Sequence, residues 1–463
     1  MSEVFERVAV ETVPLGELLI DIRNGLVVEQ EKESPGIPIT RIETISKGTV
    51  DMDRVRYVRD AAGKNLENFW LKKGDILFSH INSDLHLGKT ALVLSDAPLL
   101  HGMNLLRLRV DSNRLRPKYL HHWLDYCRRT GVFMAIAQHA VNQSSLNQKK
   151  ITSLEVPLCS IEQQDEIVAE IEKQFSRLDE AVANLQRVKA NLKRYKASVL
   201  KAAVEGRLVE TEASIAQREG RSYEAGEQLL QRILDERRAK WALKKKYLEP
   251  ESGAQCFLID SLPEGWVNAT VEQLSQLVEY GSSSKTSDDA TGIPVLRMGN
   301  IFEGELRFDD LKYLPNEHDE FPKLLMNDGD LLFNRTNSPE LVGKVAVFHS
   351  KPTNYSFASY LIRVRTVTGV LPNFLAAYIN SSFGRQWVKS VVTQQVGQAN
   401  VNGTKLQALA VPLPPLAEQT RIVAELDRHM TIIREVESEV DVNLQRAQAL
   451  RQATLSKAFG TGQ

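Results

Sequence analysis

Apolar side chains recur every seven residues in two long stretches of the chain. The first series is Ile171, Leu178, Leu185, Leu192 and Val199, and the second is Leu426, Ile433, Val440, Ala447 and Thr454. This spacing is typical of a helix that packs on a partner helix in a coiled coil. No Gly or Pro interrupts residues 161–205, and about 45 residues at roughly 1.5 Å each make a helix of about 68 Å.

The two predicted helices can supply each other's partner, so we expect an antiparallel coiled coil. The alternative is that each helix lies exposed on a separate domain. Both helices belong to a larger internal repeat, which is the strongest feature of the sequence. Gly36-Ile-Pro-Ile matches Gly292-Ile-Pro-Val, and Gly74-Asp-Ile-Leu-Phe matches Gly329-Asp-Leu-Leu-Phe. The matching residues lie 256 and then 255 positions apart, which indicates one duplicated unit.

The repeat divides the chain into five predicted parts. Residues 1–159 and 261–415 form two similar globular units, 160–206 and 416–463 hold the long helices, and 207–260 connect them. Short aliphatic runs at 75–79, 90–94 and 105–110 predict strands, and 117–136 predicts a helix that starts at Pro117. Within the connector, 223–247 is rich in helix-forming residues. We therefore predict a mixed α/β (α+β) fold with a pseudo-two-fold internal repeat.

Composition indicates an ordinary globular protein. Of the 463 residues, 42% are hydrophobic and 25% charged. No apolar run reaches the roughly 18 residues of a membrane span, and the first residues do not look like a signal peptide. The three cysteines are widely spaced and fit a reducing cytoplasm. The net charge of −1 gives no overall basic signature, so any nucleic-acid contact must come from local clusters.

Several stretches resemble catalytic motifs but lack residues that those motifs require or have a simpler interpretation. Gly88-Lys-Thr resembles the end of a phosphate-binding loop, but Ser83 stands where that loop needs Gly. The nine histidines show no metal-binding spacing. Asp75 and Asp330 could be catalytic carboxylates, although a turn before a strand is the simpler interpretation. The sequence predicts no catalytic site, no metal and no cofactor bound by this chain.

Polar loops in each unit instead suggest recognition. Residues 139–150 and 394–405 are rich in amides and hydroxyls, and 79–83 and 334–338 form a second matched pair. Asn and Gln can pair with adenine and Arg with guanine, whereas Lys binds phosphates. The loop residues differ between the copies while the apolar framework is kept. Two domains of one fold that read different sequences would show this pattern, although a polar loop can also be merely solvated.

The predicted DNA-binding residues come from these loops and from neighbouring basic positions. They are Arg41, Ser79, His80, Asn82, Lys89, Gln143, Ser144, Ser145, Asn147, Lys149 and Lys150 in the first copy, and Arg297, Asn334, Arg335, Thr336, Asn337, Lys344, Gln395, Gln398, Asn400, Asn402 and Lys405 in the second.

The chain resembles the DNA-specificity subunit of type I restriction–modification systems over essentially its whole length. The resemblance rests on Gly-Asp-(Ile/Leu)-Leu-Phe in both copies, on Val156-Pro-Leu and Val411-Pro-Leu, and on Gln164 and Gln419 in Gln-x-x-Ile-Val-Ala-Glu. The connector from Gly226 to Trp241 and the opening Leu262-Pro-Glu-Gly-Trp are also typical. The first copy lacks that opening.

The resemblance implies a function that spacing does not. Each globular unit would be a target-recognition domain for one half of a split, asymmetric DNA sequence. The coiled coil would set the gap between the halves and dock two modification subunits, which use S-adenosylmethionine to methylate adenine. Restriction subunits using ATP and Mg²⁺ would join them. Two alternatives remain: a coiled-coil protein adaptor, or a stand-alone methyltransferase or nuclease with an unrecognised catalytic site.

Overall fold

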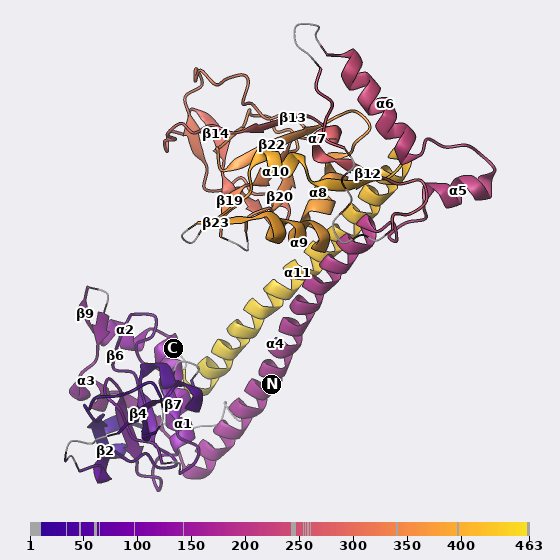
Figure 1. The fold of residues 1–463 in the computed structure, drawn as a ribbon. Helices are drawn as coiled ribbons and strands as arrows, with labels where there is room; N and C mark the ends of the chain where they lie inside the picture. The colour runs from indigo at the N-terminus through magenta and orange to yellow at the C-terminus, as the bar shows by residue number, and fades with distance from the viewer. Residues whose placement is uncertain are drawn as a thin grey trace. The chain divides into compact units, whose positions relative to one another are not determined.

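The computed structural model of the chain consists of two compact units. Each unit includes part of both long helices, and unit 1 is discontinuous in sequence. The structure describes residues 11–33, 35–45, 48–59, 63, 65–96, 98–141, 143–241, 247–252, 254, 256, 259, 261–338, 341–395 and 398–460. Unit 1 comprises residues 1–187 and 440–463, and unit 2 comprises 188–439. In Figure 1, unit 1 runs from indigo to violet and includes the yellow C-terminal end of α11, and unit 2 runs from magenta through orange to the yellow first part of α11.

The elements of the first half repeat in the second. The first half contains β1 (Glu11–Pro14), β2 (Leu19–Asn24), β3 (Ile37–Ile39), β4 (Arg56–Val58), β5 (Ile76–Phe78), β6 (Ile81–Asn82), β7 (Thr90–Leu92), β8 (Leu106–Val110), α1 (Pro117–Arg129), α2 (Val132–Ile136), β9 (Gln138–Ala140), β10 (Gln143–Ser145), α3 (Gln148–Thr152), β11 (Glu155–Leu158) and α4 (Ile161–Val204).

The connector contributes two helices before the second copy begins. They are α5 (Glu212–Glu219) and α6 (Gly226–Ala239). The second copy contains β12 (Val267–Thr270), α7 (Val271–Leu274), β13 (Ser275–Tyr280), β14 (Ile293–Leu296), β15 (Ile301–Phe302), β16 (Glu305–Leu306), β17 (Lys312–Leu314), β18 (Leu331–Asn334), β19 (Thr336–Asn337), β20 (Val345–Val347), β21 (Ser356–Phe357), β22 (Leu361–Thr366), α8 (Pro372–Asn380), α9 (Ser382–Val391), β23 (Thr393–Gln395), β24 (Gln398–Asn400), α10 (Gly403–Gln407), β25 (Ala410–Leu413) and α11 (Leu416–Phe459).

Both units are built on the same four-stranded antiparallel sheet. Its order is β2-β8-β5-β7 in unit 1 and β13-β22-β18-β20 in unit 2. The central strands β5 and β18 are fully buried, as expected for short runs of Ile, Leu and Phe with apolar cover on both faces. Two-stranded ladders β1-β11 and β12-β25 tie the start of each copy to its end. The mixed α/β fold and its duplication are therefore confirmed.

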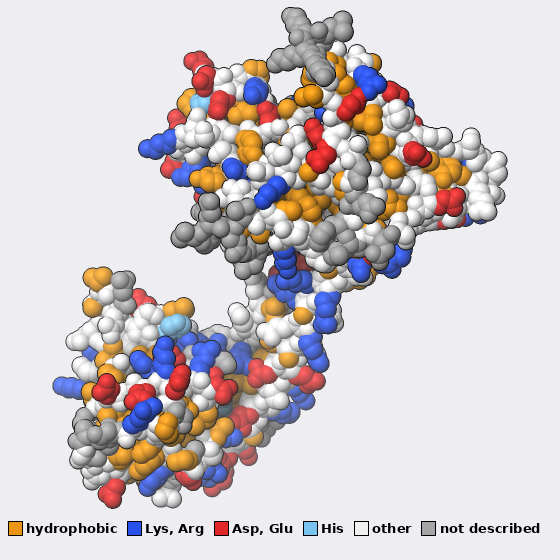
Figure 2. Space-filling model, in the orientation of Figure 1, with side chains coloured by type: hydrophobic (Ala, Val, Ile, Leu, Met, Phe, Trp, Pro, Cys, Tyr) orange, Lys and Arg blue, Asp and Glu red, His pale blue; other side chains and the backbone are white. Residues whose placement is uncertain are grey.

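The helices α4 and α11 are equivalent, with 44 residues each. They run antiparallel. In unit 2, Tyr195 of α4 forms a hydrogen bond with His429 of α11, and in unit 1 the earlier residue Asp179 of α4 forms an ion pair with the later residue Arg451 of α11. The second seven-residue series is buried throughout, and the first is buried or half-buried. Charged side chains of both signs cover the outer faces of these helices (Figure 2). The coiled-coil pairing follows from burial of the apolar series.

A buried glutamine fixes the start of each long helix. Gln164 donates from Nε2 to the Arg114 and Cys159 carbonyls at 3.0 and 2.9 Å, and its Oε1 accepts from the Arg116 amide. Gln419 makes the equivalent contacts with Gly369, Pro414 and Leu371. A buried amide with its groups paired avoids the cost of desolvation. The repeated Gln therefore locks the helix to the loop that precedes α1 or α8.

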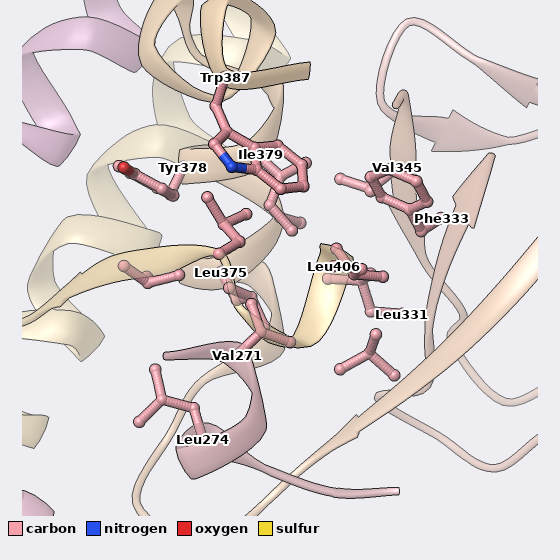
Figure 3. Close-up of a cluster of buried hydrophobic side chains, with 14 of the residues drawn as sticks. Val271, Leu274, Leu331, Phe333, Val345, Leu375, Tyr378, Ile379, Trp387 and Leu406 are labelled. Carbon is pink, nitrogen blue, oxygen red and sulfur yellow. The ribbon is translucent and has the colours of Figure 1, made fainter. Parts of the chain in front are cut away.

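Each unit has a core between its main sheet and its short helices. In unit 2, Val271, Leu331, Leu375 and Trp387 point into one cluster from four different elements (Figure 3). In unit 1 the cluster also takes in Leu455 and Phe459 from the end of α11, with the Phe459 ring centroid 5.2 Å from that of Tyr119. Burying each such side chain contributes roughly 1.5–3 kcal/mol.

Two sequence predictions about helices are wrong in detail. The predicted helix 117–136 is two helices, because Gly131 adopts a φ of 81° and ends the first. The predicted helix 223–247 is reduced to α6, Gly226–Ala239, and residues 242–246 lie outside the described part. Helix α5 was not predicted, although Thr211 caps it by accepting from the Ser214 amide.

Candidate nucleic-acid interface

The two polar loops predicted in each copy pair with each other in the structure. In unit 1, β6 carries the first loop and β10 the second, with Asn82 opposite Ser144 in an antiparallel ladder. Strand β9 completes a three-stranded sheet, β6-β10-β9. Unit 2 has the equivalent sheet β19-β24-β23, with Asn337 opposite Ala399 and Thr336 opposite Asn400. Loops about 60 residues apart in sequence thus form one small polar sheet, twice.

Backbone contacts hold these sheets at the same register. The His80 carbonyl accepts from the Leu146 amide at 2.8 Å, and the Arg335 carbonyl accepts from the Val401 amide at 2.9 Å. The two pairs occupy equivalent positions, 255 residues apart. The polar sheet is therefore part of the duplicated framework, while its side chains differ between the copies.

Some of the predicted DNA-binding residues stabilise the fold in both units. The Asn147 and Asn402 side chains cap α3 and α10 by accepting from the Lys150 and Lys405 amides at 2.9 and 2.8 Å. The Lys150 ammonium donates to the Ile136 carbonyl, where α2 ends, and the Lys405 ammonium donates to Val391, where α9 ends. Asn is favoured at helix starts and Lys at helix ends for these reasons.

Burial separates the remaining candidates. Ser79, Ser144 and Asn334 are buried, which argues against their direct contact with a base in this conformation. Gln143 and Lys149 are exposed in unit 1, as is the capping Asn147; Asn402 is exposed in unit 2. His80, Asn82, Ser145, Arg335, Thr336 and Asn400 are half-buried on or beside the two sheets. The side chains of Asn337, Gln395 and Gln398 lie outside the described part.

Four basic candidates belong to other parts of their units. Arg41 and Arg297 follow β3 and β14, where Arg41 lies 3.6 Å from Glu43 and Arg297 lies 3.3 Å from Asp310. Lys89 and Lys344 follow glycines in tight turns, and burial lowers the pKa of both ammonium groups. Gly88 has a φ of 74°, and a Cβ there would lie 2.1 Å from the Phe133 ring. This Gly-Lys turn is thus required by backbone geometry and close packing.

A network of polar side chains supports the unit 1 sheet. The Ser144 hydroxyl donates to Asp84, while His139 Nδ1 lies 2.8 Å from the same hydroxyl. Asn82 donates to the Ser79 hydroxyl at 3.0 Å. Burial lowers the pKa of His80 to about 4, so this imidazole is neutral at pH 7. Unit 1 therefore presents amides, hydroxyls and a neutral imidazole.

The unit 2 sheet borders two aromatic residues that sequence analysis missed. Tyr280 and Tyr360 are 44% and 49% exposed, which is unusual for side chains of this size. Tyr280 lies under Arg335, and the Tyr360 carbonyl accepts from the Arg335 amide at 3.1 Å. No local pattern links these residues, because Tyr280 comes 55 positions before Arg335 in the chain.

The described residues contain no group of three or more His, Cys, Asp or Glu side chains placed to hold a metal ion. Among the same residues, no helix is both long and apolar enough to cross a membrane.

Two copies of one mixed α/β domain, each with a polar three-stranded sheet and a paired long helix, define a duplicated recognition protein. Comparison with known families agrees. The model of the type I restriction modification DNA specificity domain matches residues 8–194 and 263–442. The chain belongs to this family and is a DNA specificity subunit.

Relatives of known name support this membership, and solved structures share the fold. The putative MjaX specificity subunit of Methanocaldococcus jannaschii is 29% identical over 92% of this chain and 89% of its own length. The EcoKI specificity subunit of Escherichia coli is 30% identical over 41% of each chain. The HsdS subunit of Thermoanaerobacter tengcongensis has a similar fold, with a TM-score of 0.52 and 18% identity over 99% of both chains. A chain from a structure that describes the complex assembly and conformational transition of the type I R-M system has a TM-score of 0.63, with 18% identity over 98% of both chains.

Proposed function

We propose that the chain reads a two-part DNA target, one part with each copy of the repeat. The recognition domains are residues 1–159 and 261–415, and the contacts to bases come from the surfaces of β6-β10-β9 and β19-β24-β23. One observation carries the proposal: both copies join the same two polar loops at the same register. A framework held constant under different polar side chains suits two domains that read different sequences.

The same proposal assigns the chemistry to partner subunits. Two modification subunits carry S-adenosylmethionine and methylate adenine, and restriction subunits use ATP and Mg²⁺ to cleave unmodified DNA. The paired helices α4 and α11 are the docking scaffold for the modification subunits and set the spacing of the half-sites. The place of action is the cytoplasm. Family membership and the paired long helices support this assignment.

Loop variants test the proposal in the complete complex. We would replace Gln143 and Ser145 by Ala in one strain, and Thr336 and Asn400 by Ala in another, then map N6-methyladenine across the host genome. The first variant should change one half of the methylated motif and the second variant the other half. These positions avoid the helix caps, whose loss alone would cost about 1 kcal/mol.

Two controls complete the design. Asn147→Ser keeps a capping side chain and tests whether that amide also reads a base. Deletion of the gene should abolish the motif, which a coiled-coil adaptor unrelated to DNA would not do. If both loop variants leave the motif intact while gene deletion removes it, the proposed reading surfaces are wrong.

A further inference from the structure

Arg335 joins the main sheet of unit 2 to its polar sheet, between β18 and β19. Its amide donates to the Tyr360 carbonyl at 3.1 Å, and its carbonyl accepts from the Val401 amide at 2.9 Å. The backbone of this residue is thus held by contacts to two distant segments. A side chain attached at such a point starts from a fixed position, which is what geometric recognition of a base requires.

The guanidinium of Arg335 lies over an aromatic ring. Its central carbon lies 4.8 Å from the Tyr280 ring centroid, and Nη1 donates to the Ser359 carbonyl at 3.2 Å. The Tyr280 hydroxyl in turn accepts from the Gly403 amide at 2.7 Å, at the start of α10. Tyr280 is therefore anchored to the same small region of unit 2 as the polar sheet. Stacking on a ring limits the orientations available to an Arg side chain.

Most of the hydrogen-bonding capacity of this guanidinium is unused. Within the described part of the chain, Arg335 forms no ion pair with a carboxylate, and its side-chain hydrogen bond is the one from Nη1 to Ser359. Its Nε is buried and unpaired, which normally carries a cost of about 1–3 kcal/mol. A half-buried cation without a carboxylate, beside exposed aromatic rings, favours an external acceptor as its partner.

We infer that Arg335 reads a guanine in the half-site of the second unit, and that Tyr280 is the residue that positions it. The inference rests on the proposed function. A planar Arg fork presents two parallel N–H groups, which match the O6 and N7 acceptors of guanine in the major groove. A phosphate could also accept from Arg335, but a guanidinium positioned over the Tyr280 ring and bonded to the Ser359 carbonyl favours a base edge over a contact that needs only charge.

The first unit carries a different residue at the same place. His80 is equivalent to Arg335, because the Leu146 amide donates to its carbonyl as Val401 does to Arg335. Strand β2 ends at Asn24 where β13 ends at Tyr280, so the supporting ring is absent too. The two half-sites should therefore differ at the base pair that faces this position.

Arg335→His is the decisive variant, because the fold already accommodates His at the equivalent position of unit 1. The variant would replace the native gene in the host, and N6-methyladenine would be mapped across the genome. One half-site should contain a guanine whose preference over other bases falls roughly 5- to 150-fold. The other half-site should stay unchanged. The matched control is Arg307→His, since Arg307 also stacks on an aromatic ring, 3.5 Å from the Phe302 centroid, outside the polar sheet.

Two variants of Tyr280 test its positioning role. Tyr280→Phe keeps the ring under Arg335 and should keep the guanine preference, whereas Tyr280→Leu removes the ring and should relax that preference at the same base. A purely structural role would lower methylation at all sites without changing base preference. The thermal midpoint of each purified variant separates unfolding from altered reading.

Three results would overturn the inference. The first is the absence of guanine from the half-site read by the second unit. The second is a methylation level in Arg335→His that falls equally whichever base occupies the position, as a phosphate contact predicts. The third is loss of folding in Arg335→His, since equivalence with His80 requires the variant to fold. In all three cases the Thr336 and Asn400 variants can still change that half-site, so the proposed function would stand. It fails separately if those variants change nothing.

Discussion

The paired aspartates Asp75 and Asp330 show how one residue type can suggest catalysis and serve structure. Both are buried, and each accepts two hydrogen bonds from one arginine, at 2.7 Å from Arg109 and at 2.6 and 2.7 Å from Arg365. Each carboxylate also accepts a hydrogen bond from a backbone amide of the preceding turn, which is that of Lys72 for Asp75 and that of Asn327 for Asp330. The turn interpretation accounts for both residues, and the ion pair with Arg adds a reason that sequence alone did not supply.

Asp330→Asn should lower the free energy of unfolding by about 3 kcal/mol, because it leaves Arg365 without its charge partner and removes one of the two carboxylates paired with the buried Arg363, the other being Glu279. Urea unfolding of the purified chain measures this change. The control is Glu425→Gln, which weakens the solvent-screened pairs of Glu425 with Arg428 and His429 on α11 and should hardly move the midpoint. Equal effects of the two variants would contradict the structural role assigned to Asp330.

Residue chemistry could be predicted from sequence only in part. The sequence identified polar loops, but it could not separate a polar side chain that caps a helix from one that lies on the polar sheet, because both occur in the same short segment. Asn147 and Ser145 illustrate this, since two positions apart they do different work. Tyr280 was missed because its partners Arg335 and Gly403 lie 55 and 123 positions away.

At the scale of elements, local patterns gave the best predictions. The long helices α4 (161–204) and α11 (416–459) lie within the stretches 160–206 and 416–463 that were predicted to hold them, because the seven-residue repeat and the absence of Gly and Pro are both local signals. The polar sheets could not be predicted. Their strands have two or three residues without apolar alternation, and β6 and β19 find their partners about 60 positions away.

Leu178→Asp combined with Leu185→Asp should separate α4 from α11 within unit 1, because both leucines are half-buried in the series that faces α11. We expect loss of co-purification with modification subunits and loss of all methylation, not of one half-site. Ala183→Asp, at an exposed position between the two leucines, is the control and should preserve both. Methylation that persists in the double variant would refute a scaffold role for these helices.

The whole chain is close to electrically neutral, with 58 Lys and Arg against 59 Asp and Glu. Non-specific DNA affinity comes mainly from basic side chains that neutralise phosphates. The isolated chain should therefore bind DNA weakly at physiological salt, and the modification subunits should supply much of the grip on phosphates.

Fluorescence anisotropy with a duplex that carries the mapped motif measures this directly. The chain alone should bind at least tenfold more weakly than the chain with its modification subunits, and should prefer the motif only slightly over a scrambled duplex. Tight and sequence-specific binding by the chain alone would show that partner subunits are not needed to hold the DNA.

The discontinuity of unit 1 has a consequence for how the protein is made. Leu455 and Phe459, near the end of the chain, are part of the core of unit 1, which otherwise comes from the first 187 residues. During translation at about 5–20 residues per second, the ribosome needs roughly 13–50 s to make the residues between Arg187 and Val440. Throughout that time, the apolar surface around Tyr119 has no native cover from α11. The domain synthesised first is thus the last to be completed, and chaperone binding to the nascent chain should concentrate on it.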